Sequence, residues 1–415
     1  MASCLFCFLQ VSAQENSPYS RYALGNLVSG KNAAYRGMAG VCMADDNPLV
    51  NNPDNPASYS YLKLTSFQVG VEGISNNIRN EATSNRTGSL TLSYVNIGIP
   101  VSKHMGISFG LVPFTRAKYA MQQSDTLPGI SKVIYDYYGG GGTQKIYVGT
   151  AYRFGDFSVG VNAGYLFGNV INSVDETFTD TLKIISSSVT SRTLVGGIFI
   201  QPAFTMVKKI KGDLQMSAGI SYTLSQNANG RKDTYWKSFF GSVTAPQYQY
   251  NVDSIVEKRG KVYLPGNLAV GIMVRNGDIW KAGIDVNMSN WQQYRSYGAA
   301  DSTTKAVSVR LGGSITPDPT SVRQTWKRMS FRGGLYFGKD MLKFNNTELT
   351  QAGFTLGAGY PIRRSNLATS MGQLNAAIDI GQRGTLKNSL LLESYTRFVI
   401  GFTFNDRWFI KRKYD

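Results

Sequence analysis

Few residues of this 415-residue chain have the types and spacing that catalysis requires. The single histidine, His104, follows Lys103 in a stretch that reads as a turn, so a Ser-His-Asp mechanism has one poorly placed base. The glycine run Gly139–Gly142 lacks the Gly-Lys-Ser/Thr continuation of a phosphate loop and reads as a loop. Asp45 and Asp46 lack the ligand spacing of a calcium loop, and we expect them to meet arginines instead. We therefore predict no enzymatic activity, no metal site and no cofactor.

The composition favours a β-rich membrane protein. Charged residues make up only 17% of the chain, against about 25% in an ordinary soluble domain. The 12% aromatic content excludes disorder, and no run of about 20 apolar residues is present to form a spanning helix. The net charge of +17 is dispersed, with no basic helix or RNA-binding signature. We therefore expect phosphorylated lipid head groups of the lipopolysaccharide type, rather than nucleic acid, as the counter-charge.

Hydrophobic side chains alternate with polar or small ones over most of the chain. Five apolar residues between positions 280 and 288 share one face of an extended strand, namely Trp280, Ala282, Ile284, Val286 and Met288. The segment Phe157–Phe167 repeats the pattern. Successive side chains of a strand point to opposite faces, so each such segment has one apolar and one polar face.

Fourteen segments of this kind are centred near residues 68, 93, 109, 148, 162, 198, 219, 269, 286, 311, 333, 356, 377 and 399. Most reach the 9–11 residues that a membrane-crossing strand needs, and their number is even. They predict an all-β fold, a transmembrane antiparallel β-barrel of about 14 strands. A large soluble β-sandwich or propeller is the alternative, but no repeat of about 40–50 residues supports a propeller.

The connections support the barrel, because short turns and long loops alternate as on the two sides of an outer-membrane barrel. The short turns are Pro100–Lys103, Gly155–Asp156, Lys208–Gly212 and Asn276–Asp278. The long external loops are Ser75–Thr87, Lys118–Gly142, Ile171–Thr190 and Gln226–Arg259. Aromatic residues at the predicted strand ends, among them Tyr94, Tyr152, Tyr360 and Trp408, are expected at the lipid–water boundary.

Charged residues also occur on the polar, inward face of the predicted strands. They are Glu72, Lys281, Asp285, Arg310, Arg332, Asp379 and Arg397. One interpretation is that they pair with one another and with the backbone of a segment inside the barrel. The other is that some line a permeation path, in which case Arg332 could grip a ligand carboxylate bidentately.

The two ends of the chain differ from its alternating middle. Residues 1–13 read as the remnant of a secretory signal peptide without its usual basic start, the alternative being a buried first strand. Cleavage there would leave Cys42 as the last cysteine and no disulfide framework. Residues 14–60 are rich in Gly, Pro and Asn, which favours a compact plug in the lumen of a barrel formed by residues 61–405. Residues 406–415 form a basic tail expected in the periplasm.

Several stretches resemble the long-chain fatty-acid outer-membrane transporters, the FadL family, of which this chain looks like a divergent branch. In "YRGMAGVCMADDNPLVNNPDNPAS", the glycines Gly37 and Gly40 and the triplet Asn55-Pro56-Ala57 resemble that family's N-terminal hatch. The stretch "LPGNLAVGIMVRNGDIWKAGIDVNMSNWQQY" resembles its central strand pair, and "FRGGLYF" and "AGFTLGAGYPI" its late strands. The resemblance implies a plugged fourteen-stranded barrel that takes up hydrophobic molecules.

Two expectations about function follow. The first, which the resemblance implies, is passive uptake of a hydrophobic, fatty-acid-like compound across the bacterial outer membrane. Pro113 interrupts the third strand, where the resembled family has a kink that forms a lateral exit for apolar cargo. Pro113 could equally mark an ordinary strand end. The second is a structural subunit of a larger outer-membrane assembly, such as a secretion or barrel-insertion complex, in contact with other outer-membrane or periplasmic proteins.

Overall fold

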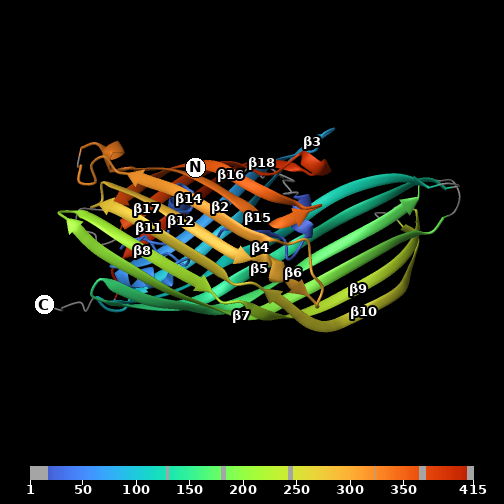
Figure 1. The fold of residues 1–415 in the computed structure, drawn as a ribbon, viewed down its shortest axis with the longest axis horizontal. Helices are drawn as coiled ribbons and strands as arrows, with labels where there is room; N and C mark the ends of the chain where they lie inside the picture. The colour runs from blue at the N-terminus through green and yellow to red at the C-terminus, as the bar shows by residue number, and fades with distance from the viewer. Residues whose placement is uncertain are drawn as a thin grey trace, which may run out of the picture.

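Fourteen antiparallel strands, counted over the described residues, form the wall of a closed barrel (Figure 1). The computed structural model describes residues 17–127, 130–178, 184–241, 246–321, 323–363 and 371–408. The predicted signal peptide and the basic residues of the predicted tail from position 409 onward lie outside this range. The wall strands are β2 (Thr65–Arg79), β3 (Ser84–Pro100), β4 (Met105–Leu127), β5 (Ile130–Phe154), β6 (Phe157–Phe178), β7 (Ser186–Lys211), β8 (Leu214–Thr223), β11 (Asn267–Asn276), β12 (Trp280–Asn290), β14 (Lys305–Ile315), β15 (Ser330–Phe344), β16 (Thr347–Arg363), β17 (Met371–Gly384) and β18 (Leu392–Asp406).

The first and last wall strands close the barrel. β18 pairs with β2 along its whole length, from Leu392 opposite Arg79 to Asp406 opposite Thr65. A spanning sheet needs this closure, because an open edge in hydrocarbon would leave backbone N–H and C=O groups without partners. Each of the fourteen predicted strand centres lies within one of these strands, so the predicted fold class is confirmed.

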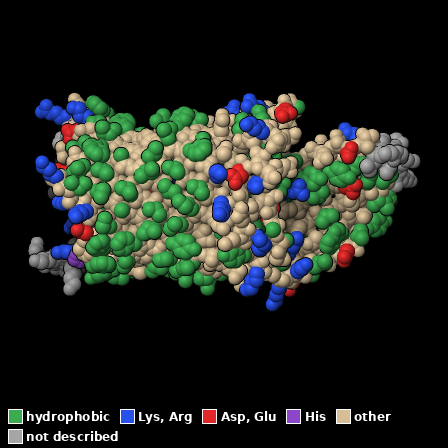
Figure 2. All heavy atoms as spheres, viewed as in Figure 1, with side chains coloured by type: hydrophobic (Ala, Val, Ile, Leu, Met, Phe, Trp, Pro, Cys, Tyr) green, Lys and Arg blue, Asp and Glu red, His purple; other side chains and the backbone are tan. Residues whose placement is uncertain are grey.

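The apolar face of the wall points outward. Ile198 is 70% exposed, Phe337 61% and Leu356 59%, whereas the intervening inward positions, such as Ser158 and Asn162, are buried. This arrangement suits a barrel in hydrocarbon and excludes a sandwich, in which the apolar faces of two sheets would bury each other. Figure 2 shows the apolar side chains spread over the barrel wall.

The prediction of long external loops is wrong, because strands continue through most of them. β4 and β5 remain paired up to Leu127 opposite Ile130, and β6 and β7 extend similarly. At the position of the fourth predicted loop, β9 (Gln226–Gly241) and β10 (Pro246–Leu264) pair as the two antiparallel strands of a hairpin. Polar stretches with weak alternation resemble loops in the sequence. They form strands here because neighbouring strands supply partners for their backbone N–H and C=O groups.

The β9–β10 hairpin and β8 lie one after the other along the same edge of β7. The C-terminal part of β7 pairs with β8, and the N-terminal part of β7 pairs with β9. One long strand is therefore hydrogen-bonded to two shorter ones. Together β4–β7, β9 and β10 form a sheet that projects beyond the rest of the wall, at the end of the molecule away from the C-terminus (Figure 1). In the part of the chain that is described, no helix is long and apolar enough to cross a membrane.

The buried core lies inside the barrel, where the N-terminal residues 17–64 sit. They form η1 (Pro18–Arg21), β1 (Asn26–Leu27), α1 (Ala33–Arg36) and η2 (Pro56–Tyr61). Two glycines of the wall face carbonyl groups of this segment closely: a Cβ at Gly219 would collide with the Met43 carbonyl, and one at Gly312 with that of Met38. The small inward residues thus make room for this segment.

Candidate functional site: the lumen and the wall beside Pro113

The wall holds the N-terminal segment by hydrogen bonds to its backbone. The Asp285 carboxylate accepts hydrogen bonds from the amides of Cys42 (2.7 Å) and Met43 (3.0 Å). The Thr355 hydroxyl accepts from Ala39 N and donates to Gly37 O, at 2.8 and 3.1 Å. The segment has little regular structure of its own, so these contacts satisfy backbone groups that would otherwise be buried without partners.

The five residues predicted to form the hatch shape this segment. Gly37 follows α1 and lies against Gly357 of β16, while Gly40 has a φ of +84°, which favours glycine. Asn55 begins η2: its side chain accepts a hydrogen bond from Ala57 N at 3.1 Å and donates one to Thr205 at 2.8 Å. Pro56 occupies the first position of η2, and Ala57 O accepts from Ser158. The structure thus gives each of them a turn or a contact.

Three of the predicted lumen residues meet in one charged network. The Glu72 carboxylate lies 2.8 Å from the Arg36 guanidinium and 3.7 Å from that of Arg397. Arg397 also contacts Asp379 at 2.7 Å, and Arg116 of β4 lies 3.7 Å from Glu72. These buried charges pair across β2, β4, β17, β18 and the N-terminal segment, as burial of charge requires.

The other predicted lumen residues lie under or beside the segment. The Lys281 ammonium contacts Asp45 at 2.8 Å, and Asp46 contacts Arg275 at 3.1 Å, so a lysine and an arginine, rather than two arginines, meet the adjacent aspartates. Arg332 donates to Asn375 at 2.9 Å and packs against Gly37, beneath the segment.

Arg310 has no hydrogen bond or ion pair to another described residue, and it lines the lumen cavity. No group of three or more His, Cys, Asp or Glu side chains suitable for a metal is found within the described ranges.

The seam between β3 and β4 is short. These strands pair only from Pro100 opposite Gly106 to Val95 opposite Leu111, two residues before Pro113. Beyond that point β3 pairs with β2 alone, and β4 pairs with β5, with a shift in register between Pro113 and Thr115. Pro113 therefore lies at an interruption of the wall.

A bulge in β3 adjoins the place where this seam ends. The register of β2 and β3 shifts between Gly70 and Val71, which turns Tyr94 inward, where its hydroxyl accepts a hydrogen bond from Ala33 N at 3.1 Å. The expectation that Tyr94 lies at the lipid boundary is therefore wrong. Tyr152, Tyr360 and Trp408 are exposed, at 54%, 41% and 51%. An extra residue in one strand changes which face later side chains occupy.

The N-terminal segment occupies the place that β3 leaves. Asn26 and Leu27 of β1 pair with Arg116 and Thr115, and Val28 N donates to Phe114 O at 2.9 Å. On the other side, the Asn26 side chain accepts a hydrogen bond from Arg383 at 2.7 Å. The two residues of β1 are thus hydrogen-bonded to β4 on one side and to Arg383 of β17 on the other, at the place where β3 and β4 are no longer paired.

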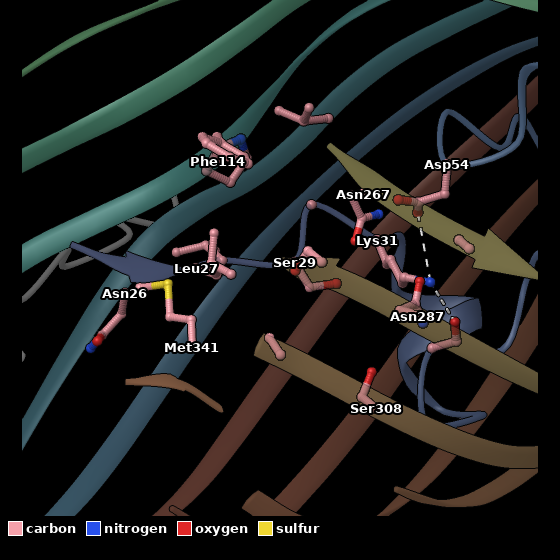
Figure 3. A pocket seen from close by; sticks show the side chains of 18 of the residues that line it. Asn26, Leu27, Ser29, Lys31, Asp54, Phe114, Asn267, Asn287, Ser308 and Met341 are labelled. Carbon is pink, nitrogen blue, oxygen red and sulfur yellow. Dashed lines mark hydrogen bonds and ion pairs between the residues drawn. The ribbon is translucent and has the colours of Figure 1, made fainter. Parts of the chain in front are cut away.

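A cavity of about 420 Å³ adjoins the interruption. Its walls include Val112, Pro113 and Phe114 of β4 and Leu27 of β1, and it reaches Met341 of β15. Figure 3 shows its side chains converging from β1, β4, β11, β12 and β14. Apolar and charged side chains both line the space, and basic ones outnumber acidic ones.

Lys145 is one of several charged cavity residues that the sequence analysis did not single out. Its ammonium lies 4.0 Å from the centre of the Phe114 ring and 5.0 Å from that of Phe199, and it has no ion pair with a described residue. Lys31, by contrast, donates to Gly40 O at 2.6 Å and lies 3.9 Å from Asp54 (Figure 3). Lys145 stands between the outward residues Ile146 and Gln144, so alternation alone would have placed it inward.

The chain is a closed antiparallel β-barrel of fourteen wall strands among the described residues, with its N-terminal segment inside the lumen. It belongs to the BamG family, whose model matches residues 1–415.

The structure is similar to a Pseudomonas aeruginosa FadL homologue (12% identity, TM-score 0.58) and to the Pseudomonas putida toluene transporter TodX (11%, 0.58). It is also similar to the Ralstonia pickettii toluene transporter TbuX (14%, 0.55). Each alignment covers 92% of this chain and 99% of the other. At such identity the likeness shows a shared fold. No curated protein matches the sequence.

Proposed function

We propose that this chain is a passive outer-membrane channel for hydrophobic or amphipathic small molecules, which leave the lumen sideways between β3 and β4. The observation that carries the proposal is the short β3–β4 seam, because the lumen cavity is lined by Val112, Pro113 and Phe114 directly beyond it. A sideways route lets apolar cargo pass from the lumen to the bilayer without crossing water. The toluene transporters with the same fold support this proposal.

In this proposal residues 14–60 are a plug and β1 is its movable part. The middle of the segment is held by buried ion pairs, such as Arg36 with Glu72. β1 has only two paired residues, and Leu27 is 44% exposed. Its displacement would free the edge of β4 at Thr115 and Arg116 while the rest of the plug stays in place.

The cavity favours cargo with an anionic head group, such as a fatty acid. Lys145 and Arg310 line the cavity and make no ion pair with a described residue, although Asp285 stands opposite Arg310 on the neighbouring strand. Phe114, Phe199 and Leu27 offer apolar surface beside Lys145. A carboxylate would satisfy the charge while its chain contacts these side chains.

A disulfide lock tests the lateral route. Leu27→Cys with Thr115→Cys joins register partners across the β1–β4 contact. The matched pair Val309→Cys with Phe337→Cys joins β14 to β15, far from the interruption in the strand order. Uptake of a radiolabelled fatty acid and of toluene into proteoliposomes should fall to background in the oxidised β1–β4 variant and return after reduction, while the control transports in both states. Uptake that persists through the oxidised lock would refute the lateral route.

A second candidate function is that of a structural subunit in an outer-membrane assembly. The projecting sheet favours it, since β10 pairs over residues 246–260 with β9 alone and exposes Tyr250, Val252 and Val256 at 58%, 64% and 55%. An exposed strand edge can accept a strand from another protein. Purification in mild detergent separates the two functions: a stoichiometric partner lost when β9–β10 is shortened supports the subunit, and a solitary barrel supports the channel.

A further inference from the structure

Five basic side chains form a continuous patch on the outward surface of the projecting sheet. This outer basic patch consists of Arg192, Arg231, Arg259, Lys261 and Arg295. Strand register shows that they are neighbours. Arg231 of β9 stands directly opposite Arg259 of β10, and Lys261 stands opposite Asn229, diagonal to Arg231.

The patch extends to the strands on either side. Arg295 of β13 (Arg295–Ser296) stands opposite Tyr263, two residues beyond Lys261. Arg192 of β7 stands opposite Asp233, two residues beyond Arg231. Residues opposite each other in an antiparallel pair lie on one face, so these cations share a single surface.

This surface points away from the lumen. The alternate residues of β9 and β10, Ala228, Val262 and Leu264, are buried in the cluster that contains Trp291. The patch residues between and beside them are all exposed. Figure 2 shows Lys and Arg side chains gathered near the middle of the molecule, between the apolar barrel wall and the projecting sheet.

The patch begins just outside the apolar belt. On β7 the belt includes the exposed residues Ile198, Ile200 and Phe204. Arg231 stands opposite Leu194, four residues from Ile198, which corresponds to about 13 Å along the strand. At the other end of the belt lie Lys208 and Lys209. Phosphates of lipid head groups lie at this depth, next to the hydrocarbon.

The charges of the patch are not balanced within the protein. Arg231 contacts Glu257 at 3.2 Å and Asp233 at 3.9 Å. The side chains of Arg259 and Arg192 have no hydrogen bond or ion pair within the described residues. Like charges directly opposite each other destabilise a sheet, so an anion bound between Arg231 and Arg259 would relieve repulsion that the carboxylates beside Arg231 offset only on its own side.

We propose that the outer basic patch binds the phosphates of a phosphorylated glycolipid of the outer leaflet, the lipid A part of lipopolysaccharide. The guanidinium groups hold the phosphates through paired N–H donors, and the acyl chains lie along Ile198 and Ile200. The proposal rests on the proposed outer-membrane location and not on transport.

The test compares two triple variants that remove equal charge. Arg259→Gln with Lys261→Gln and Arg295→Gln removes three of the five patch charges, while Lys208→Gln with Lys209→Gln and Lys211→Gln removes three charges at the opposite end of the belt. Each is purified in detergent, checked for folding by heat-modifiable gel mobility, and titrated with bis-phosphorylated lipid A by native mass spectrometry. The patch variant should bind at least about tenfold more weakly than the control variant, because it has lost three cations that face the lipid phosphates.

Dephosphorylated lipid A should bind both variants and the parent chain equally. An equal loss in the two variants would show that net charge alone attracts the lipid, and no loss in either would show that the patch does not bind it. Either result would overturn the proposal. Failure of the disulfide-locked uptake assay would leave this one untouched, because lipid A binding needs no open channel.

Discussion

Two seams on either side of the β2–β3 hairpin differ greatly. β18 and β2 pair through fifteen residues, whereas β3 and β4 pair through six. Beside the long seam the N-terminal segment is fastened by buried ion pairs, and beside the short seam it supplies two residues of strand. The contrast shows that one barrel can have a fully paired contact between β18 and β2 and, two strands further along, a partly paired contact between β3 and β4 that N-terminal residues of the same chain cover.

The largest expected effect comes from the sealed side. Glu72→Gln leaves the buried guanidinium groups of Arg36 and Arg397 without their shared carboxylate, and should lower the free energy of unfolding by about 3–5 kcal/mol. Guanidinium-chloride unfolding in detergent micelles measures it. Glu348→Gln is the control, since its pair with Lys339 is exposed and should contribute at most about 1 kcal/mol. Equal losses in both variants would mean that the buried network does not fasten the segment.

A second prediction concerns the fit between segment and wall. Gly312→Leu would collide with the Met38 carbonyl and should displace the segment, costing about 1–3 kcal/mol and raising ion conductance in planar bilayers. Gly333→Leu on the neighbouring strand faces outward, where the nearest atom is 3.9 Å from an added Cβ, and should leave conductance unchanged. An unaltered conductance in Gly312→Leu would contradict the role of the segment as a seal.

The third prediction concerns the contact of β1 with β4, beyond the end of the short seam. Asn26→Ala removes the hydrogen bonds to Arg383 and Ser17 and should cost about 1 kcal/mol locally. Hydrogen exchange of the peptide covering residues 113–118 should become severalfold faster, with residues 397–403 of β18 unchanged as the internal reference. Faster exchange in both regions would indicate global rather than local opening.

The smallest effect concerns cargo chemistry. Lys145→Met keeps the length of the side chain and removes its charge between the Phe114 and Phe199 rings. Affinity for a fatty-acid carboxylate should fall about fivefold to tenfold, while that for toluene stays the same. Fluorescence displacement with both ligands measures this difference. A parallel fall for the two would assign Lys145 to packing instead of charge recognition.

The positions of the wall strands could be predicted from this sequence. The lengths of the strands, and the side of the wall to which each side chain points, could be predicted only in part. Alternation is a local property, and it located all fourteen wall strands, including the inward positions of Glu72 and Asp379. It failed at Tyr94, where one bulged residue reverses the pattern, and in residues 226–259, where polar residues form a hairpin. The bulge and the hairpin both depend on which strand pairs with the segment in question. A short stretch of sequence does not contain that information.

The site was predictable in part for the same reason. The inward charges were visible as a set, but their pairing joins residues hundreds of positions apart, such as Arg36 with Glu72 and Asp379. Pro113 pointed to the interrupted strand, whereas nothing in the short stretch Asn26–Leu27 distinguishes it from a turn. Its two-residue strand exists only because β4 offers an edge there.

The rim of the barrel is uneven, because β4–β7 with the β9–β10 hairpin rise above the other strands. The step in height between β3 and β4 falls at the same place as the short seam. This end of the barrel is consequently sheltered on one flank and low on the other. The barrel therefore has a front and a back, so a neighbouring molecule beside β4 would meet a tall sheet and one beside β3 a lower wall.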